Sequence, residues 1–266
     1  MDLQLTGKRA LITGGSRGIG LAIAKQLARE GARIALAARD PAALESAAQA
    51  LRAETGAEVV TAVVDTASDQ SVKDMVAAVT AALGGVDILV NAAAKPGGQA
   101  PPPKLAEVTD ALFWDDVNVK VMGYLRCARE VAPGMAAQGW GRIINISGTA
   151  ARQTGNIVGS IRNVAVASLT KNLADELGPS GINVTVVHPG LTRTEKTGPL
   201  IASRAEKAGK TPADIEKDMA ANVVVGRLIT AEEVADVVAF LASPRSVSIT
   251  GDAVVAGGGV KRSIYY

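Results

Sequence analysis

The stretch Thr-Gly-Gly-Ser-Arg-Gly-Ile-Gly at residues 13–20 decides the fold of this chain. It follows a short apolar run at residues 9–13 and leads into an amphipathic helical pattern, so its glycines lie in a strand-to-helix turn. In such a turn Gly14 permits the tight bend, Gly18 lets a pyrophosphate approach the backbone, and Gly20 allows close packing of helix and strand. The N–H groups at the start of the helix attract an anion. The stretch therefore predicts a dinucleotide-binding site.

Strand and helix patterns alternate from this stretch to the end of the chain. Most expected strands are continuous runs of Val, Ile, Leu and Ala, as is typical of parallel strands with helices on both faces. We therefore expect an α/β fold in which residues 1–266 form a single domain, a Rossmann-type, doubly wound, parallel seven-stranded sheet with helices on both faces. The expected strands are residues 9–13, 33–37, 58–64, 87–91, 142–147, 183–188 and 253–256, and the expected helices begin near Ile19, Pro41, Asp69, Asp110, Ile157 and Ala231.

The composition is that of an ordinary globular protein and argues against several classes of partner. Of the 266 residues 48% are hydrophobic, and 28 Lys and Arg against 26 Asp and Glu give a net charge of +2. Without a basic block or a long apolar run, the chain is expected to bind no nucleic acid and no membrane, and to have a small-molecule substrate. The N-terminus has no signal-peptide pattern, which predicts a cytoplasmic location. Cys127, the single cysteine, is interpreted as a small buried hydrophobe.

Two stretches interrupt the alternation of strands and helices. Residues 95–104 (KPGGQAPPPK) are rich in Pro and Gly and follow an expected strand, where open α/β sheets place their ligand crevice. Residues 192–225 form an insertion rich in Lys, Glu and Ala between the sixth strand and the last helix. The insertion is either a helical lid over a substrate or a pair of solvated surface helices, and both interpretations stay open.

The end of the second expected strand bears on the choice of nucleotide. An acidic side chain there would hold the ribose 2′-hydroxyl of NAD. The sequence reads Ala-Ala-Arg-Asp at residues 37–40, so Arg39 together with Arg17 could bind a 2′-phosphate instead. NADP(H) is therefore the favoured cofactor. NAD(H) is the alternative, because Asp40 could reach the ribose and either arginine could be a solvated charge.

Several motifs together resemble the short-chain dehydrogenase/reductase family over essentially the whole chain. The glycine stretch matches the family's cofactor signature, Asp65 the acid that holds the adenine, and Asn118 the asparagine of the catalytic tetrad. The resemblance implies hydride transfer with a nicotinamide dinucleotide. The residues expected at this cofactor are Gly14, Ser16, Arg17, Gly18, Ile19, Gly20, Arg39, Asp65 and Thr66, then Asn91, Ala92 and Ala93 of an NNAG-like stretch, and Pro189, Gly190, Thr192 and Thr194 of a PGxxxT-like segment.

The predicted catalytic helix departs from the family pattern, which uses a Tyr-x-x-x-Lys pair and a serine in the preceding loop. An ungapped alignment from the fifth strand puts Gly148 at the serine, Ile161 at the tyrosine and Ala165 at the lysine. Ile161 and Ala165 share one helix face and would shape an apolar pocket wall without donating a proton. The missing lysine would weaken cofactor binding about tenfold to a hundredfold, the effect of one lost charged hydrogen bond. The tyrosines of the chain, all outside this helix, are Tyr124, Tyr265 and Tyr266.

Several residues could replace the missing serine, tyrosine and lysine, and each of them also has a purely structural interpretation. Ser147 could turn its hydroxyl to a substrate oxygen, although strand alternation favours the opposite face. Arg162, which with Ser160 and Asn163 flanks the apolar pair, could stabilise an oxyanion, although an exposed or interface charge is the simpler interpretation. His188, the one histidine, could titrate near neutral pH or pack under the cofactor loop.

Two functions remain open. The first is an NADP(H)-dependent oxidoreductase with an atypical active site, in which Asn118 and Ser147 are catalytic and hydride moves to or from a small carbonyl, imine or activated C=C bond. The second is a catalytically silent dinucleotide-binding protein that senses or scaffolds. No cluster of His, Cys, Asp or Glu has metal-ligand spacing, so no metal site is expected. The resemblance also implies a homotetramer or homodimer packed through the helices that begin near Asp110 and Ile157.

Overall fold

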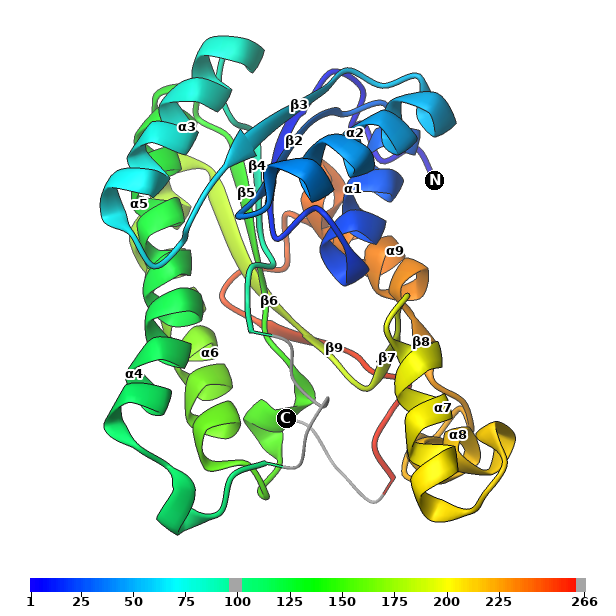
Figure 1. The fold of residues 1–266 in the computed structure, drawn as a ribbon. Coiled ribbons are helices and arrows are strands. Elements are labelled where there is room, and N and C mark those ends of the chain that lie inside the picture. Colours follow the sequence, from blue (N-terminus) through cyan, green and yellow to red (C-terminus); the bar gives the residue numbers. More distant parts are fainter. Residues whose placement is uncertain (96–101, 262–266) are drawn as a thin grey trace.

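The structure is a computed structural model that describes residues 1–95 and 102–261. Its main sheet consists of the strands β1 (Arg9–Thr13), β2 (Arg33–Ala38), β3 (Val59–Val63), β4 (Ile88–Asn91), β5 (Gly141–Ile146), β6 (Ile182–Pro189) and β9 (Ala253–Ala256). All are parallel, in the order β3-β2-β1-β4-β5-β6-β9 (Figure 1). The strand order reverses between β1 and β4, which is where open α/β sheets bind ligands. The predicted doubly wound, seven-stranded Rossmann-type fold is confirmed.

Helices cover both faces of this sheet. They are α1 (Gly18–Arg29), α2 (Pro41–Thr55), α3 (Asp69–Leu83), α4 (Asp110–Val117), α5 (Gly123–Ala137), α6 (Ile157–Leu177), α7 (Thr197–Ala208), α8 (Pro212–Ala220) and α9 (Ala231–Ala242). Helices α1, α2 and α9 pack on one face, and α3, α5 and α6 pack on the other (Figure 1). The predicted helix starts agree with the observed ones, except that α1 begins at Gly18 instead of Ile19.

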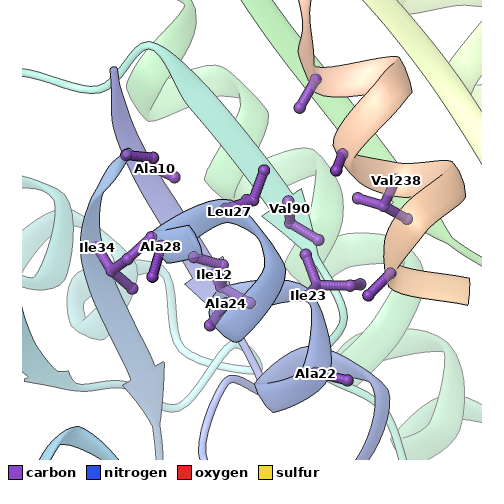
Figure 2. Packing of buried hydrophobic residues seen from close by; sticks show 14 of the residues in the cluster. Ala10, Ile12, Ala22, Ile23, Ala24, Leu27, Ala28, Ile34, Val90 and Val238 are labelled. Atoms are coloured by element: carbon purple, nitrogen blue, oxygen red, sulfur yellow. The ribbon is translucent and has the colours of Figure 1, made fainter. Parts of the chain in front are cut away.

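Small aliphatic side chains fill the layer between α1 and the sheet. Ile23 and Leu27 of α1 lie against Ile12 of β1 and Val90 of β4, and Val238 of α9 closes the cluster from the side (Figure 2). All five are fully buried. Removal of this much apolar surface from water holds α1, and with it the glycine loop, in a fixed position on the sheet.

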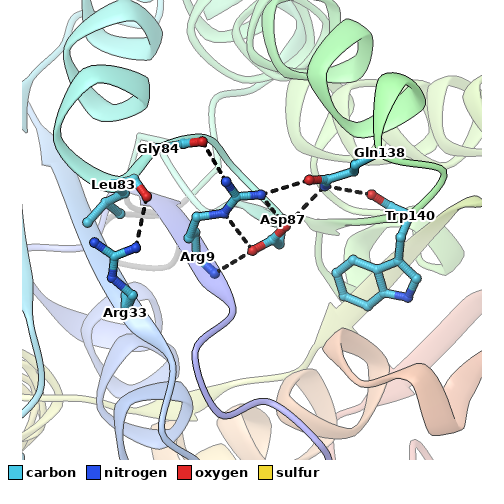
Figure 3. Close-up of polar contacts among 7 residues, drawn as sticks. All are labelled: Arg9, Arg33, Leu83, Gly84, Asp87, Gln138 and Trp140. Atoms are coloured by element: carbon cyan, nitrogen blue, oxygen red, sulfur yellow. Dashed lines mark hydrogen bonds and ion pairs between the residues drawn. The ribbon is translucent and has the colours of Figure 1, made fainter.

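A polar network fixes the strand edge opposite the glycine loop. Arg9, at the start of β1, donates from Nε and Nη2 to the Asp87 carboxylate at 2.8 Å and 2.6 Å, and Gln138 bridges the same pair (Figure 3). Burial of Asp87 opposes its ionisation, but the hydrogen bonds from Arg9 outweigh it and lower the pKa of the carboxyl. The bidentate pair therefore ties β1 to β4, the two strands on either side of the expected crevice.

The helix predicted from Asp110 is not one regular α-helix. A π-helical segment, Asn118–Met122, separates α4 from α5. Its carbonyls are engaged from outside the helix, because Thr66 Oγ1 donates to the Val119 carbonyl at 2.9 Å and Arg126 donates to that of Asn118 at 3.3 Å. Hydrogen bonds of this kind compete with the regular helical ladder and allow the wider turn. A search for helical periodicity cannot detect this change of register.

The insertion contains α7 and α8, which pack on each other through Ile201, Ala205 and Ile215. A small parallel ladder joins the start of the insertion to the segment that follows it, and is formed by β7 (Thr192–Arg193) and β8 (Ile229–Thr230). The insertion is thus a separate helical pair beside the sheet (Figure 1). Of the predicted Pro/Gly-rich loop, residues 96–101 lie outside the described residues.

Candidate active site

A cavity of about 1620 Å³ lies at the carboxyl ends of the strands. It begins at the glycine loop after β1, passes the ends of β2 to β6 and reaches the start of the insertion. Pockets for single drug-sized ligands measure about 300–1,000 Å³, so this one has room for a long ligand and a second molecule beside it. The position is the topological switch point that the strand order indicated.

Close backbone approaches require glycine in the loop after β1. Gly14 has a φ of +69°, and a Cβ there would lie 2.8 Å from the backbone nitrogen of Ala93. A Cβ at Gly20 would lie 2.3 Å from the carbonyl oxygen of Gly14. The N-terminus of α1 holds an anion already, because the backbone N–H of Gly18 donates to Glu195 Oε2 at 3.2 Å. The loop is therefore shaped to place a negative group at the start of α1.

All the residues predicted at the cofactor except Asn91 line the cavity. They are Gly14, Ser16, Arg17, Gly18, Ile19, Gly20, Arg39, Asp65, Thr66, Ala92, Ala93, Pro189, Gly190, Thr192 and Thr194. Asn91 is fully buried inside the sheet, where its Nδ2 donates to Asn145 Oδ1 at 3.0 Å. The side chain of Asn91, the last residue of β4, thus points into the interior, and its two alanine neighbours line the cavity.

The side chain of Asp40 has a structural role at the start of α2. Its Oδ1 accepts hydrogen bonds from the backbone N–H groups of Ala42 and Ala43, at 3.0 Å and 3.2 Å. Asp40 is thus the N-cap of α2. Arg17, Arg39 and Asp40 all line the cavity.

Asn118 is not among the residues that line the cavity, and its catalytic role stays a prediction. Its Nδ2 donates to the Ala67 carbonyl at 3.4 Å, and its Oδ1 accepts from Arg126 at 2.9 Å. Both contacts lie on the α3 and α5 side of the π-helical segment. The altered helical register turns this side chain away and brings Lys120 to the cavity in its place.

Lys120 is the functional candidate that the sequence interpretation missed. Its side chain is buried, and Nζ donates to the Ser147 carbonyl and to Asn163 Oδ1, each at 3.1 Å. Burial, and secondly the charge of Arg162, lower the pKa of this amine to about 7, while Asp116 acts in the opposite direction. The available signal was a lone lysine within the apolar run VNVKVM at residues 117–122.

The first turns of α6 present different residues to the cavity from those predicted. Ile161 is 47% exposed, and neither it nor Ala165 lines the cavity. Gly159 and Asn163 face it instead, with the same i, i+4 spacing. Asn156 caps α6, where its side chain accepts a hydrogen bond from the Gly159 N–H at 2.8 Å.

Arg162 is not an exposed charge, as the sequence had suggested. Only 12% of its side chain is exposed, and Nη1 donates to both carboxylate oxygens of Asp116 at 2.7 Å and 2.9 Å. It lines the cavity next to Asn163, and its Nε is buried with no hydrogen-bond partner among the described residues.

Ser147 lines the cavity, whereas His188 lies behind it against the Gly148 backbone. The Ser147 hydroxyl donates to the backbone carbonyl of Asn163 at 3.1 Å. His188 is buried, and its Nδ1 accepts from the Gly148 N–H at 3.4 Å. Burial, followed by the charges of Arg152 and Lys120, lowers the pKa of His188 to about 4. His188 is therefore neutral at pH 7 and acts as a packing residue.

The remaining candidate proton donors are in the interior. Tyr124 is buried and donates its hydroxyl to the Ile146 carbonyl at 2.9 Å, and burial raises the pKa of its phenol. Burial raises the pKa of the Cys127 thiol to about 12, in accord with the predicted buried hydrophobe. Tyr265 and Tyr266 lie outside the described residues. Within residues 1–95 and 102–261, no cluster of His, Cys, Asp and Glu could hold a metal ion.

Comparison with known proteins agrees with this geometry. A family described as enoyl-(acyl carrier protein) reductase matches residues 14–261. The chain belongs to the short-chain dehydrogenase/reductase family. The 3-oxoacyl-[acyl-carrier-protein] reductase of Pseudomonas aeruginosa is 36% identical, over 98% of this chain and 100% of that protein.

Solved structures of this family share the whole fold. L-sorbose reductase from Gluconobacter frateurii, complexed with NADPH and L-sorbose, has a TM-score of 0.92 and 32% identity, covering 99% of this chain and 100% of that one. A variant of actinorhodin polyketide ketoreductase with NADPH has a TM-score of 0.87 and 33% identity, over 96% and 98% of the two chains. In the described part of this family member, no helix is long and apolar enough to cross a membrane.

Proposed function

We propose that this family member is an NADP(H)-dependent reductase of a small carbonyl substrate, with an atypical active site. The observation that supports it is one continuous cavity that joins the glycine loop, the Arg17 and Arg39 pair and the buried Lys120. Similar proteins are named as reductases of 3-oxoacyl groups and of L-sorbose, and both substrates carry a ketone.

The residues present fit a nicotinamide dinucleotide. The Glu195 carboxylate on the Gly18 N–H occupies the position where a helix N-terminus binds a pyrophosphate. The glycine loop would hold the two phosphates, Asp65 the adenine, and the segment from Pro189 to Thr194 the nicotinamide. Once bound, the dinucleotide supplies a hydride. The protein's own part is to orient the substrate, exclude water and deliver a proton.

The preference for NADP(H) rests on the residues after β2. Arg17 and Arg39 both line the cavity, and two guanidinium groups suit a 2′-phosphate because their donors are planar and fixed. The carboxylate that could favour NAD(H), that of Asp40, is held as the cap of α2. Asp40 also lines the cavity, so two cations and one capping carboxylate meet at this end of it.

The site is atypical because the Tyr-x-x-x-Lys pair is missing. On the cavity face of α6, the pair with the corresponding spacing is Gly159 and Asn163. Neither can donate a proton as a phenol paired with an ammonium does. The silent dinucleotide-binding protein is thus the competing proposal, and turnover decides between the two.

The test is NADPH oxidation by the purified full-length protein, followed by absorbance with ketoses, 3-oxoacyl thioesters, imines and enones. We expect substrate-dependent oxidation with at least one carbonyl compound. The control is Gly14→Ala, whose Cβ would lie 2.8 Å from the backbone of Ala93, so that this variant loses NADPH binding and turnover together. Tight NADPH binding by the wild type without turnover of any substrate class would favour the silent protein.

We also propose that two or four copies associate through α4 and α6. Five large apolar side chains of these helices are exposed: Leu112, Trp114, Ile157, Ile161 and Val164. A second copy packed on this face would bury them, which explains an isoleucine at position 161. The lid role of α7 and α8 and the cytoplasmic location stay predictions.

A further inference from the structure

Lys120 is a buried cation that the family pattern does not account for. It is 3% exposed, and it reaches the cavity from the π-helical segment Asn118–Met122. Lysine is rarely buried to this degree unless it is paired with an acid. Yet the two acceptors of its Nζ are uncharged oxygens, the Ser147 carbonyl and Asn163 Oδ1.

The charged side chains nearest to Lys120 form an ion pair with each other. Asp116 of α4 is bonded through both carboxylate oxygens to Arg162 of α6, so it neutralises the arginine more directly than the lysine. His188 of β6, on the remaining side, is neutral at pH 7. An ammonium has three donors, and the two bonds to Ser147 and Asn163 leave one for a molecule in the cavity.

Two glycines of the cavity wall lie next to the residues that hold Lys120. Position 148 is a glycine next to Ser147, and a Cβ there would lie 3.1 Å from Asn163 Nδ2. Position 159 is also a glycine, one turn before Asn163 on the same face. A Cβ at position 159 would lie 2.7 Å from Asn156 Nδ2, so the side chain of Asn156, which also lines the cavity, occupies this part of the wall.

Ser147 is not placed to give up a proton. Its hydroxyl hydrogen is directed to the Asn163 carbonyl at 3.1 Å, so the hydroxyl oxygen is left as an acceptor. Lys120, with a pKa lowered to about 7 by burial and by Arg162, holds a proton that it can transfer at neutral pH. A general acid works best when its pKa lies near the working pH.

We propose that Lys120 is the catalytic proton donor of this site, held in position by Asn163 and the Ser147 carbonyl. The inference rests on the proposed reductase function. As the carbonyl carbon of the substrate gains a hydride from the reduced nicotinamide dinucleotide, its oxygen gains a proton from Nζ. One N–H bond breaks, one O–H bond forms, and the C=O double bond becomes a C–OH single bond. Lys120 is left as a neutral amine that water protonates again, and the dinucleotide leaves oxidised.

The lysine and the asparagine of this site would thus each come from the helix that supplies the other residue in the family pattern. In the family pattern the helix after the fifth strand supplies the lysine and the preceding helix supplies the asparagine. Here α6 supplies Asn163 and the preceding helical segment supplies Lys120, and the two side chains are in hydrogen-bond contact. The cation reaches the same region of the cavity from the opposite wall, without a tyrosine between it and the substrate.

The test compares wild type with Lys120→Met, Lys120→Arg and the control Lys171→Met, which removes an exposed lysine of α6 paired with Asp175. The first readout needs neither cofactor nor substrate. In the free protein with 13C-labelled lysine, NMR should show one lysine signal that titrates near pH 7 and is missing in Lys120→Met only. A full set of lysine signals titrating near pH 10, as for exposed lysines, would overturn the proposal.

The second readout is kcat/KM against pH, with the NADPH Kd measured by fluorescence. Because the donor must be protonated, wild-type kcat/KM should fall as the pH rises through about 7. Lys120→Met should lose about a hundredfold or more in kcat/KM and lose this pH limb, while still binding NADPH. Lys120→Arg should be as slow, because arginine keeps the charge but cannot release its proton.

The outcomes separate the two proposals. Near-normal activity of Lys120→Arg would show that the residue acts only as a fixed charge, and near-normal activity of Lys120→Met would show that it is structural. Either result overturns the role of Lys120 and leaves the reductase function intact. A wild type that binds NADPH but reduces no carbonyl would overturn the reductase function, and with it the proton-donor role.

Discussion

The Glu195 carboxylate lies where the proposed dinucleotide would place its pyrophosphate. Its carboxylate accepts a hydrogen bond from the Gly18 N–H at 3.2 Å, at the N-terminus of α1 where a pyrophosphate would bind. One helix terminus cannot serve both anions, so the carboxylate must leave when the phosphates arrive. Because Glu195 lies two residues before the start of α7, its departure would couple the ligand to the insertion.

Glu195→Gln should therefore bind NADPH more tightly than wild type. The variant keeps the side-chain shape but removes the like charge, and interactions of this kind at helix termini amount to about 0.3–1 kcal/mol, or roughly twofold to fivefold in Kd. Fluorescence titration measures the change, with Glu206→Gln in the same insertion as the control. Weaker or unchanged binding by Glu195→Gln would mean that the carboxylate does not compete with the ligand.

At the scale of elements, a buried polar ladder joins β4, β5 and α6. Asn91 Nδ2 donates to Asn145 Oδ1, Asn145 Nδ2 donates to Thr170 Oγ1 at 3.0 Å, and Thr170 donates to the Val166 carbonyl at 2.8 Å. All three polar side chains are fully buried. The ladder holds α6, which carries Asn163, against the strands that carry the rest of the cavity floor.

Thr170→Val should lower the free energy of unfolding by about 1–3 kcal/mol, because the isosteric valine leaves the buried Asn145 amide without its acceptor. Urea denaturation measures the loss. Thr80→Val, at an exposed position of α3, is the matched control and should change little. Equal stabilities of the two variants would show that the ladder adds nothing to the attachment of α6.

These elements also show which features of the structure can be predicted from sequence patterns. The bounds of β1 and β9 coincide with those predicted, because a parallel strand covered on both faces must be a continuous apolar run. The rotation of α6 and the π-helical segment could not be predicted in this way. Neither feature leaves a periodic pattern in the sequence: α6 begins at the Asn156 cap, and the π-helical segment accepts a hydrogen bond from Thr66, which is distant along the chain.

For the whole molecule, the order of strands decides where a ligand can bind. The glycine loop, the Arg39 position and the Pro189 turn come from distant parts of the chain, and parallel strands bring them to one edge of the sheet. For this reason the sequence could place all but one of the residues expected at the cofactor along the cavity, and their roles there stay predictions. It could not place Lys120, Gly159 and Asn163, because their positions depend on how α6 and the α4–α5 connection are rotated in three dimensions.

The most direct test of the central proposal is a calorimetric titration of the full-length protein with NADPH and, in parallel, with NADH. We expect NADPH to bind about tenfold to a hundredfold more tightly, because the 2′-phosphate gains charged hydrogen bonds from Arg17 and Arg39. Arg39→Ala should remove most of this preference, and Arg245→Ala, far from the cavity, should preserve it. Failure of both nucleotides to bind, or equal affinity for the two, would contradict the proposal of an NADP(H) site.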